Sequence, residues 1–377
     1  MRPMAIHSYT LTTLWHDRQR FLPGVLAVTF SAVLINLQTG LLLGLFSTTS
    51  IPIDHSEADI WMSAPGVLSV DLGRPISQAN LSRMASHAAL EAPEALLLDY
   101  SYWLKPDGSK ELCIVIGTQL MGQPLGAVRE LTSEMRGRLT EPGAIVVDEA
   151  ELSRLGIKAV GDRAKIGDQR VRVVGFVHGL KSLTGPYVFC SLETARLLLP
   201  GSFDQSTYLL ARCPKTGSPS KVVESLRNHS DMSAFTKEEF SLRTRIHWLT
   251  QTNAGISTAF TAALGLLVGA VVTSQSLYAA VAASMREFAV LRALGIPRSR
   301  IIAMVLALAF WVGIVGIVLA LPTTFGLSHV AEVMGTRMLL PHWLLGSVML
   351  VTMAMAIVSG LAALRSLRLT EPASLLR

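Results

Sequence analysis

The sequence predicts a membrane protein with four transmembrane α-helices and a large α+β extracytoplasmic domain between helices 1 and 2. Half of the 377 residues are hydrophobic and only 16% are charged, and the mean hydropathy is +0.44, which is too apolar for an ordinary soluble protein. Four segments have the roughly 20 apolar residues that a hydrocarbon core of about 30 Å requires. A long stretch of mixed strand and helix character, residues 47–251, separates the first segment from the second.

The four predicted spans contain no Asp, Glu, Lys, Arg or His. They cover residues 24–46, 254–283, 301–328 and 343–364. The first is longer than the roughly 7–15 apolar residues of a signal peptide, and no clear small-residue cleavage site follows it. We therefore expect the first span to be an uncleaved anchor.

Arginine flanks the spans unequally, which predicts their orientation in a multi-pass inner (plasma) membrane protein. Arginines occur in residues 1–23, 284–300 and 365–377, whereas the loop before the fourth span has only Arg337, balanced by Glu332. Short loops rich in Arg and Lys stay in the cytoplasm. Both termini and residues 284–300 are predicted to be cytoplasmic, with residues 47–251 outside, in the periplasm of a Gram-negative cell.

Turn and cap signals indicate how the external domain folds. Asp107-Gly108 and Gly167-Asp168 each lie between strand-like runs and predict β-hairpins. Residues 144–147 read as a buried strand, and Asp148 is placed to cap the helix that follows. Strands mixed with short helices are typical of an α+β domain.

The end of this domain is predicted to form a helical stalk. Leu242, Ile246 and Leu249 recur at helical spacing directly before the second span. We therefore expect this helix to run straight into the membrane.

The external domain shows no convincing catalytic or metal-binding pattern. Its three cysteines have no metal-ligand spacing and are expected to be buried, unpaired thiols. SxxK at residues 218–221 and KTG at residues 215–217 are adjacent and in reverse order, so neither matches the arrangement of penicillin-binding enzymes. There is no HExxH, GxSxG or Walker A motif and no nucleic-acid-binding signature. We predict no catalytic, cofactor or metal residues, and no nucleic-acid partner.

The predicted spans carry polar groups but no ionisable ones. Ion-driven transporters and proton relays keep ionisable residues at membrane depth, so their absence predicts an energy supply from another subunit. Asn36, Gln38, Ser274 and Gln275 are explained by interhelical hydrogen bonds or by substrate contact. The Gly40/Gly44 and Gly265/Gly269 pairs fit close helix packing, within the chain or in a dimer.

The segment between the second and third spans is more elaborate than a membrane turn requires. It is helix-favouring and amphipathic, and Gly295 and Pro297 supply a helix stop. One interpretation is an interfacial helix that binds anionic membrane lipids, and the other is a docking element for a cytoplasmic partner. The residues predicted to couple to an ATPase are Arg286, Glu287, Phe288, Leu291, Arg292, Leu294, Gly295 and Pro297.

The sequence "REFAVLRALGIPRSRI" closely resembles the signature of the MacB/FtsX-type (type VII) ABC transporter permeases. The order of one span, a large external domain and three spans is similar as well, as is the segment "AIVVDEAELSRLGIKAVGD…VRVVGFV". The N-terminal Gln38–Gly40 and Ala58–Trp61 motifs resemble the DevC branch specifically, and the terminal "EPASLLR" is also similar to the family.

This resemblance implies the permease subunit of an ABC transporter that passes ATP-driven motion to its external domain for export. It implies two copies of the chain, a homodimer being expected, bound to cytoplasmic ATPase subunits that alone bind ATP, so the chain itself is not an enzyme. In the DevC branch it also implies a membrane fusion protein and an outer-membrane channel. The alternatives are a membrane-anchored sensor, which needs a cytoplasmic output module, and a periplasmic enzyme, which needs a convergent site.

The predicted orientation can be tested by cysteine labelling. A cysteine at Gly217 should react with a membrane-impermeant maleimide in intact spheroplasts, and a cysteine at Ser299 should not. Equal labelling of the two positions would contradict the four-span topology.

Overall fold

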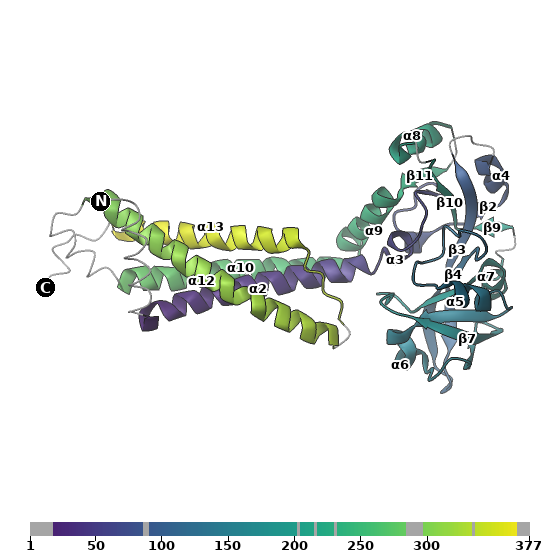
Figure 1. Cartoon of the computed structure of the whole chain (residues 1–377), viewed down its shortest axis with the longest axis horizontal. Helices are drawn as coiled ribbons and strands as arrows, with labels where there is room; N and C mark the ends of the chain where they lie inside the picture. Colours follow the sequence, from purple (N-terminus) through teal and green to yellow (C-terminus); the bar gives the residue numbers. More distant parts are fainter. Residues whose placement is uncertain are drawn as a thin grey trace. The chain divides into compact units, whose positions relative to one another are not determined.

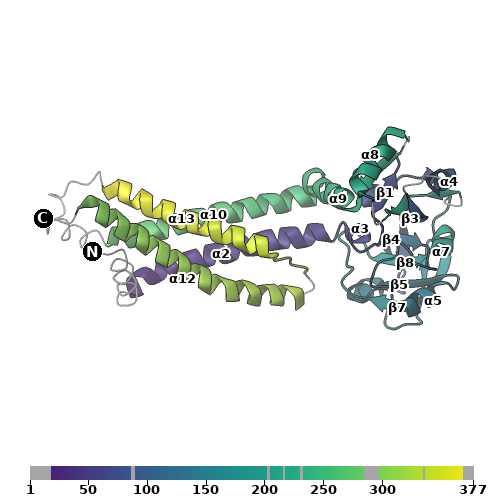
Figure 2. The same ribbon diagram turned by 45° about the horizontal axis from the view of Figure 1, so that its top comes forward.

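The computed structural model describes residues 18–85, 90–201, 204–214, 217–229, 232–283, 297–333 and 336–367. The chain divides into two compact units (Figures 1 and 2). The helical unit comprises Met1–Gly44 and Ser257–Arg377, and the sheet unit comprises Leu45–Ile256.

The long helices of the described chain are apolar enough to cross a membrane. Four such candidate spans are present, and they confirm the predicted fold class, with a sheet-rich domain between the first and the second. The spans cover Phe21–Ser47, Asn253–Ser276, Ile302–Val333 and His342–Leu361. They lie within helices α2 (Arg18–Ser47), α10 (Asn253–Ala283), α12 (Arg298–Val333) and α13 (His342–Leu367).

Small residues let the helices of the helical unit approach one another closely. A Cβ atom added to Gly316 of α12 would collide with Val28 of α2. On α10, Gly265 faces Gln38, and Gly269 faces Ser31. Gly40 and Gly44 face residues 337–340, so both predicted glycine pairs pack within the chain.

The sheet unit contains a nine-stranded sheet in the order β11-β1-β10-β3-β4-β8-β5-β7-β6, with an additional pairing of β6 to β3. That pairing closes strands β3, β4, β8, β5, β7 and β6 into a ring. The strands of the large sheet are β1 (Ile60–Ser63), β3 (Glu91–Leu104), β4 (Lys110–Thr118), β5 (Ala144–Asp148), β6 (Arg163–Ile166), β7 (Gln169–Val177), β8 (Tyr187–Ser191), β10 (Tyr208–Arg212) and β11 (Ser233–Thr236). Strands β2 (Ile76–Ser77) and β9 (Gln205–Ser206) form a separate pair.

Short helices pack against the sheet, and one of them, α6 (Leu152–Leu155), contacts the interior of the ring. Trp103 is fully buried inside the ring with Val115 and Val173, and its indole N–H donates to the carbonyl oxygen of Leu155 at 3.0 Å. The α-helices of the sheet unit are α3 (Ile51–Asp54), α4 (Ala79–Ala85), α5 (Ser133–Leu139), α6 (Leu152–Leu155), α7 (Leu192–Leu198), α8 (Pro219–His229) and α9 (Lys237–Gln251), and the 3-10 helices are η1 (Val70–Leu72) and η2 (Glu149–Glu151).

The turn and cap signals of the sequence are confirmed. β3 and β4 are joined at Asp107-Gly108, β6 and β7 at Gly167-Asp168, and both glycines have the positive φ that such turns require. The Asp148 carboxylate accepts hydrogen bonds from the backbone N–H of Ala150 at 2.8 Å and of Leu180 at 2.6 Å. It therefore caps η2 and also fixes a distant loop.

All three cysteines are buried and unpaired, as predicted. A Cβ atom at Gly217 would lie 2.9 Å from the Sγ atom of Cys213, so a cysteine introduced there could form a disulfide. Met121, which is 83% exposed, is a better external labelling position.

A buried carboxylate holds the loop that carries Met121. Glu94 on β3 accepts hydrogen bonds from the backbone N–H of Leu125 at 2.6 Å and of Gln119 at 3.1 Å. Burial raises the pKa of Glu94, although these backbone hydrogen bonds act to lower it.

A raised pKa in the folded protein means that Glu94 contributes stability at low pH and loses it as the pH rises through its folded pKa. Glu94→Gln does not titrate. The difference in unfolding free energy, wild type minus Glu94→Gln, should therefore fall as the pH rises above about 4.3. Urea unfolding of the full chain in detergent would measure it, with the exposed Glu91→Gln as control. A difference that rises with pH would contradict this account of Glu94.

Candidate functional site at the junction of the sheet unit

The structure does not place most of the predicted ATPase-coupling residues. Arg286, Glu287, Phe288, Leu291, Arg292, Leu294 and Gly295 lie outside the described residues. Pro297 is described, is exposed and directly precedes α12, where its carbonyl oxygen accepts a hydrogen bond from the backbone N–H of Arg300 at 3.0 Å. The coupling helix therefore stays a prediction.

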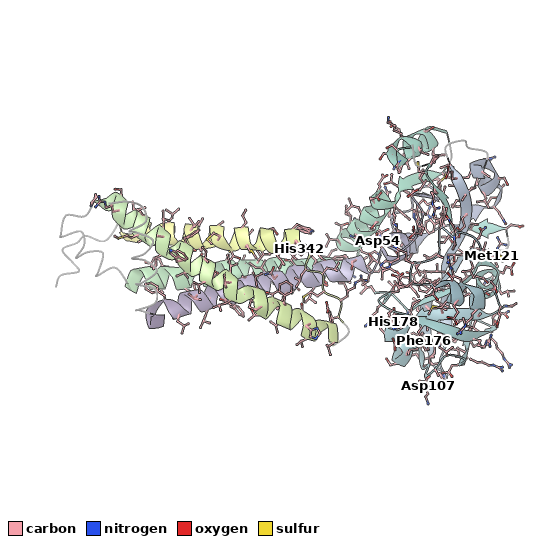
Figure 3. The ribbon with its side chains drawn as sticks, viewed as in Figure 1. Asp54, Asp107, Met121, Phe176, His178 and His342 are labelled. Atoms are coloured by element: carbon pink, nitrogen blue, oxygen red, sulfur yellow. The ribbon has the colours of Figure 1, made fainter. Side chains whose placement is uncertain are left out.

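The structure does show how the two chain connections of the sheet unit are joined. The chain enters this unit through the end of α2 and α3, and leaves it through α9. Arg245 on α9 contacts Asp54 at 2.6 Å and donates through Nε to the Ser50 hydroxyl at 2.8 Å. Ser50 in turn donates to the same Asp54 carboxylate at 2.7 Å. We call Ser50, Asp54 and Arg245 the junction clamp; Figure 3 marks Asp54 on α3.

Further charged groups surround the clamp. Arg129 donates to the carbonyl oxygen of Asp54 at 2.6 Å, and Lys237 at the start of α9 donates to that of Ser56 at 2.5 Å. Burial, followed by the nearby Arg129, lowers the pKa of Lys237. The segment after α3 is thus bonded both to the start of α9, through Lys237, and to a loop of the sheet unit, through Arg129.

Another face of α9 packs onto the sheet. The ring of Phe240, which is fully buried, stacks on Phe235 with a centroid distance of 5.1 Å and lies 5.7 Å from the ring of Trp61. Nearer the C-terminal end, the Thr244 hydroxyl accepts from the backbone N–H of Val70 at 3.2 Å. Apolar packing therefore fixes α9 to the sheet, whereas the clamp fixes α9 to the incoming chain.

Asp71 of η1 receives a second set of bonds from this region. Trp248 of α9 donates to its carboxylate at 3.1 Å, and Tyr100 of β3 donates to it at 3.4 Å. Burial, followed by the charge of Asp71, raises the pKa of Tyr100 to about 12, so the Tyr100 hydroxyl remains protonated and can keep donating at neutral pH.

The expectation that the stalk helix runs straight into the second span is wrong. α9 ends at Gln251 and α10 begins at Asn253, because Thr252 has an extended conformation with φ −107° and ψ 145°. The Thr252 hydroxyl donates to the Trp248 carbonyl at 2.6 Å and accepts from the Gly255 N–H at 3.0 Å. It therefore ends one helix and caps the next.

Gly255 is required for this turn. A Cβ atom at that position would collide with the Trp248 carbonyl oxygen. The sequence does contain a capping residue, Thr252, three positions before Gly255. The helical spacing of apolar residues around Thr252 nevertheless predicted a single helix.

Hydroxyl groups connect the helices of the helical unit. Ser31 of α2 donates to the Gly269 carbonyl at 2.9 Å and accepts from Thr273 of α10 at 2.8 Å. Ser274 of α10 and Ser359 of α13 lie 3.0 Å apart. Asn36 is buried, and its side-chain oxygen has no hydrogen-bond partner among the described residues. Ser274 thus serves helix packing, as one interpretation of the sequence expected.

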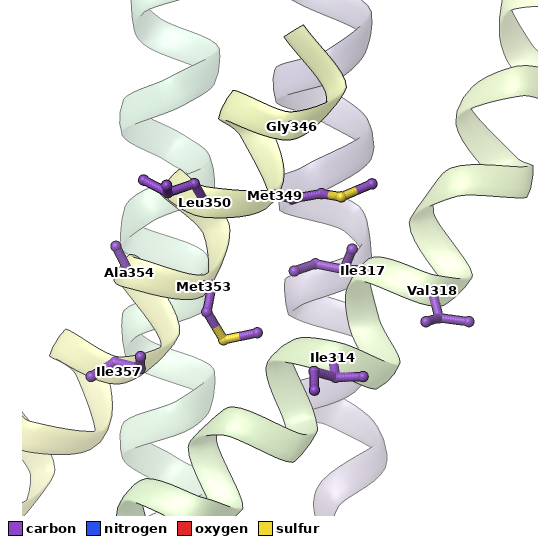
Figure 4. A pocket seen from close by; sticks show the side chains of 9 residues that line it. All are labelled: Ile314, Ile317, Val318, Gly346, Met349, Leu350, Met353, Ala354 and Ile357. Carbon is purple, nitrogen blue, oxygen red and sulfur yellow. The ribbon is translucent and has the colours of Figure 1, made fainter. Parts of the chain in front are cut away.

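α12 and α13 also form an apolar groove, with a volume of about 600 Å³. Figure 4 shows its lining side chains, which present only carbon and sulfur. The lining includes Ile317 of α12 and Met353 of α13. Both helices are candidate membrane spans, and the apolar lining of the groove matches the hydrocarbon surroundings of such spans.

Comparison with known proteins assigns the C-terminal part of the chain. Residues 259–372 match the family model described as "FtsX-like permease C-terminal". The comparison with curated proteins gives no match.

Solved structures resemble the sheet unit only distantly. The periplasmic region of MacB from Actinobacillus actinomycetemcomitans is 11% identical, with a TM-score of 0.34 over 51% of this chain and 94% of that one. The extracellular domain of the noncanonic ABC-type transporter YknZ from Gram-positive bacteria is 8% identical, with a TM-score of 0.30 over 48% of this chain and 98% of that one. At such TM-scores the likeness carries no conclusion.

The matched region contains α12, α13 and most of α10, and it includes the segment "REFAVLRALGIPRSRI" that carries the resemblance in the sequence. Four apolar helices with the sheet unit between the first two are the fold class expected for that family. Placement in the DevC branch stays a prediction, and the comparisons assign residues 259–372 of this membrane-spanning chain to the FtsX-like permease C-terminal family.

Proposed function

We propose that this chain is the permease subunit of an ABC exporter in the inner membrane and that it relays motion generated by separate ATPase subunits. The observation that carries the proposal is the FtsX-like permease domain at residues 259–372, within which the predicted coupling helix lies. The chain has no P-loop sequence. ATP is therefore bound and hydrolysed by the partner, and the permease supplies no cofactor or catalytic residue.

The relay begins at residues 284–300, which dock into a cleft on the ATPase. α10 is continuous from Asn253 to Ala283, so a displacement at its cytoplasmic end is carried along a single helix. At Thr252 the chain passes into α9, which is packed on the sheet and bonded to α3 through the junction clamp. The clamp makes the incoming and outgoing connections of the sheet unit move together.

In this proposal two copies of the chain assemble as a homodimer with two ATPase subunits. Both termini are cytoplasmic, and the sheet unit faces the periplasm, where it meets a membrane fusion protein and an outer-membrane channel. The arginine distribution supports this orientation, and the absence of ionisable residues in the predicted spans supports an external energy source.

The coupling helix can be tested by introducing charge. Leu291→Asp or Leu294→Asp should abolish copurification of the ATPase, because an apolar anchor at such an interface contributes about 2 kcal/mol or more and an unpaired buried carboxylate is costly. Membrane insertion should be unchanged, because both residues lie outside the predicted hydrocarbon core. The measurement is pull-down of the partner ATPase from native membranes.

Leu197→Asp is the matched control, since Leu197 is 49% exposed on α7 of the sheet unit. It should leave ATPase binding intact. If both coupling-helix variants bind the ATPase as the wild type does, the segment is an interfacial lipid anchor and the proposed relay is wrong.

The junction clamp can be tested separately. Arg245→Ala removes one ion pair and one further hydrogen bond. Since the side chain is 41% exposed, we expect the free energy of local opening of α9 to fall by about 1 kcal/mol. Hydrogen exchange at residues 237–251, measured on the full chain in detergent, should accelerate roughly fivefold wherever it reports local opening.

Arg136→Ala is the control, because this arginine of α5 contacts Ser133 and lies away from the clamp. The charge exchange Asp54→Arg with Arg245→Asp should recover part of the protection. Unchanged exchange in Arg245→Ala would show that the clamp does not hold the two connections together.

A further inference from the structure

The hairpin of β6 and β7 holds like charges in register. Arg163 lies directly opposite Arg172, and Lys165 lies directly opposite Arg170. Residues that face each other across an antiparallel pair point to the same side of the sheet, as do alternate residues of a strand. The four cations therefore share one face of the hairpin. Their neighbours Val171 and Val173 are buried inside the ring, so this face is the outside of the ring.

The same face continues across two more strands. Leu104 of β3 is in register with Lys165 of β6 on one side and with Lys110 of β4 on the other. Tyr102, two residues earlier on β3, shares this side of the strand and is 59% exposed. We call Lys110, Arg163, Lys165, Arg170 and Arg172 the cationic face; Tyr102 and Leu104 lie among them.

Acidic groups neutralise only part of this charge. Arg172 pairs with Glu141, and Lys165 pairs with Asp168 at 3.5 Å, although that carboxylate is fully exposed. Among the ion pairs of the described residues, none includes Lys110, Arg163 or Arg170. Both pairs are solvent-screened and weak, so the outer face keeps an excess of positive charge.

Like charges directly opposite each other in a sheet lower its stability. The hairpin has two such pairs, although its strands are only four and nine residues long. The fold of the ring does not require this loss of stability, since any polar residue would serve on an outer face. An opposing group of anions would remove the cost on binding, because it would bring carboxylates to guanidinium groups already held in place.

We propose that the cationic face is a docking surface for a protein partner that presents acidic residues around an apolar centre. Exposed tyrosine and arginine are the residue types most enriched in protein interfaces, and here Tyr102 and Leu104 supply the apolar centre with Arg163 and Arg170 around it. Three of the five cations are arginines, whose planar forks bind carboxylates with two hydrogen bonds. The fixed strand spacing suits a folded protein better than a fluid layer of lipid headgroups.

The test places a photo-reactive benzoylphenylalanine at Tyr102 of the full chain in its native cells. Irradiation should give an adduct with a polypeptide, and the cross-linked segment, mapped by mass spectrometry, should contain more Asp and Glu than Lys and Arg. The double variant Arg163→Glu, Arg170→Glu should lower the yield at least tenfold. A lipid or glycolipid adduct, a neutral or basic segment, or no adduct would each overturn the proposal.

The matched control is Arg74→Glu with Lys221→Glu, which makes the same charge change at exposed positions of the sheet unit outside the cationic face. It should leave the cross-linking yield unchanged. An equal fall in both double variants would show that the partner is attracted by the net charge of the sheet unit alone, which would overturn the proposed docking surface. Changing the mapped acidic residues of the partner to lysine should restore cross-linking to the Arg163→Glu, Arg170→Glu chain. Failure of that exchange would overturn the direct contact.

A stability measurement separates docking from folding. Arg170→Glu places opposite charges in register with Lys165, so the thermal unfolding midpoint of the sheet unit should stay equal or rise while cross-linking falls. A lowered midpoint would overturn the assignment of Arg170 to docking, because Arg170 would then serve the fold.

Discussion

Arg245 reaches from the last helix of the sheet unit to Ser50 and Asp54 at its beginning, and so joins the two connections through which this unit is attached to the membrane helices. Phe240 and Thr244 fix α9 to the sheet, and Lys237 and Arg129 also hold the incoming chain, so Arg245 adds a direct bond between the two connections. The proposed relay needs both connections to respond as one if the sheet unit is to move as a whole.

The helical unit satisfies a different constraint. Its interior has to hold helices together in hydrocarbon, where apolar side chains gain nothing over lipid. Glycine contacts such as Gly316 on Val28, and hydroxyl bonds such as Thr273 to Ser31, supply the close packing instead. These contacts are short-range and involve no charged side chain.

Local signals in the sequence predicted the elements that depend on local chemistry. The four spans followed from hydropathy, the hairpins from Asp107-Gly108 and Gly167-Asp168, and the Asp148 cap from its position after a buried strand. Thr252 was missed because an apolar spacing that continues through a cap looks like one helix. The clamp was beyond prediction, since Arg245 and Asp54 are 191 positions apart and no pattern relates a single Ser, Asp and Arg at that distance.

The closure of the ring could not be predicted either, and it explains how the cationic face can exist. β6 has only four residues, and a strand this short that carries Arg163 and Lys165 opposite two arginines would be a poor edge strand. It pairs instead with β7 on one side and with β3 on the other, while Ile166 is buried beside Trp103 in the ring. The apolar inside of the ring thus compensates for repulsion on its outside, which frees the outer positions for a partner.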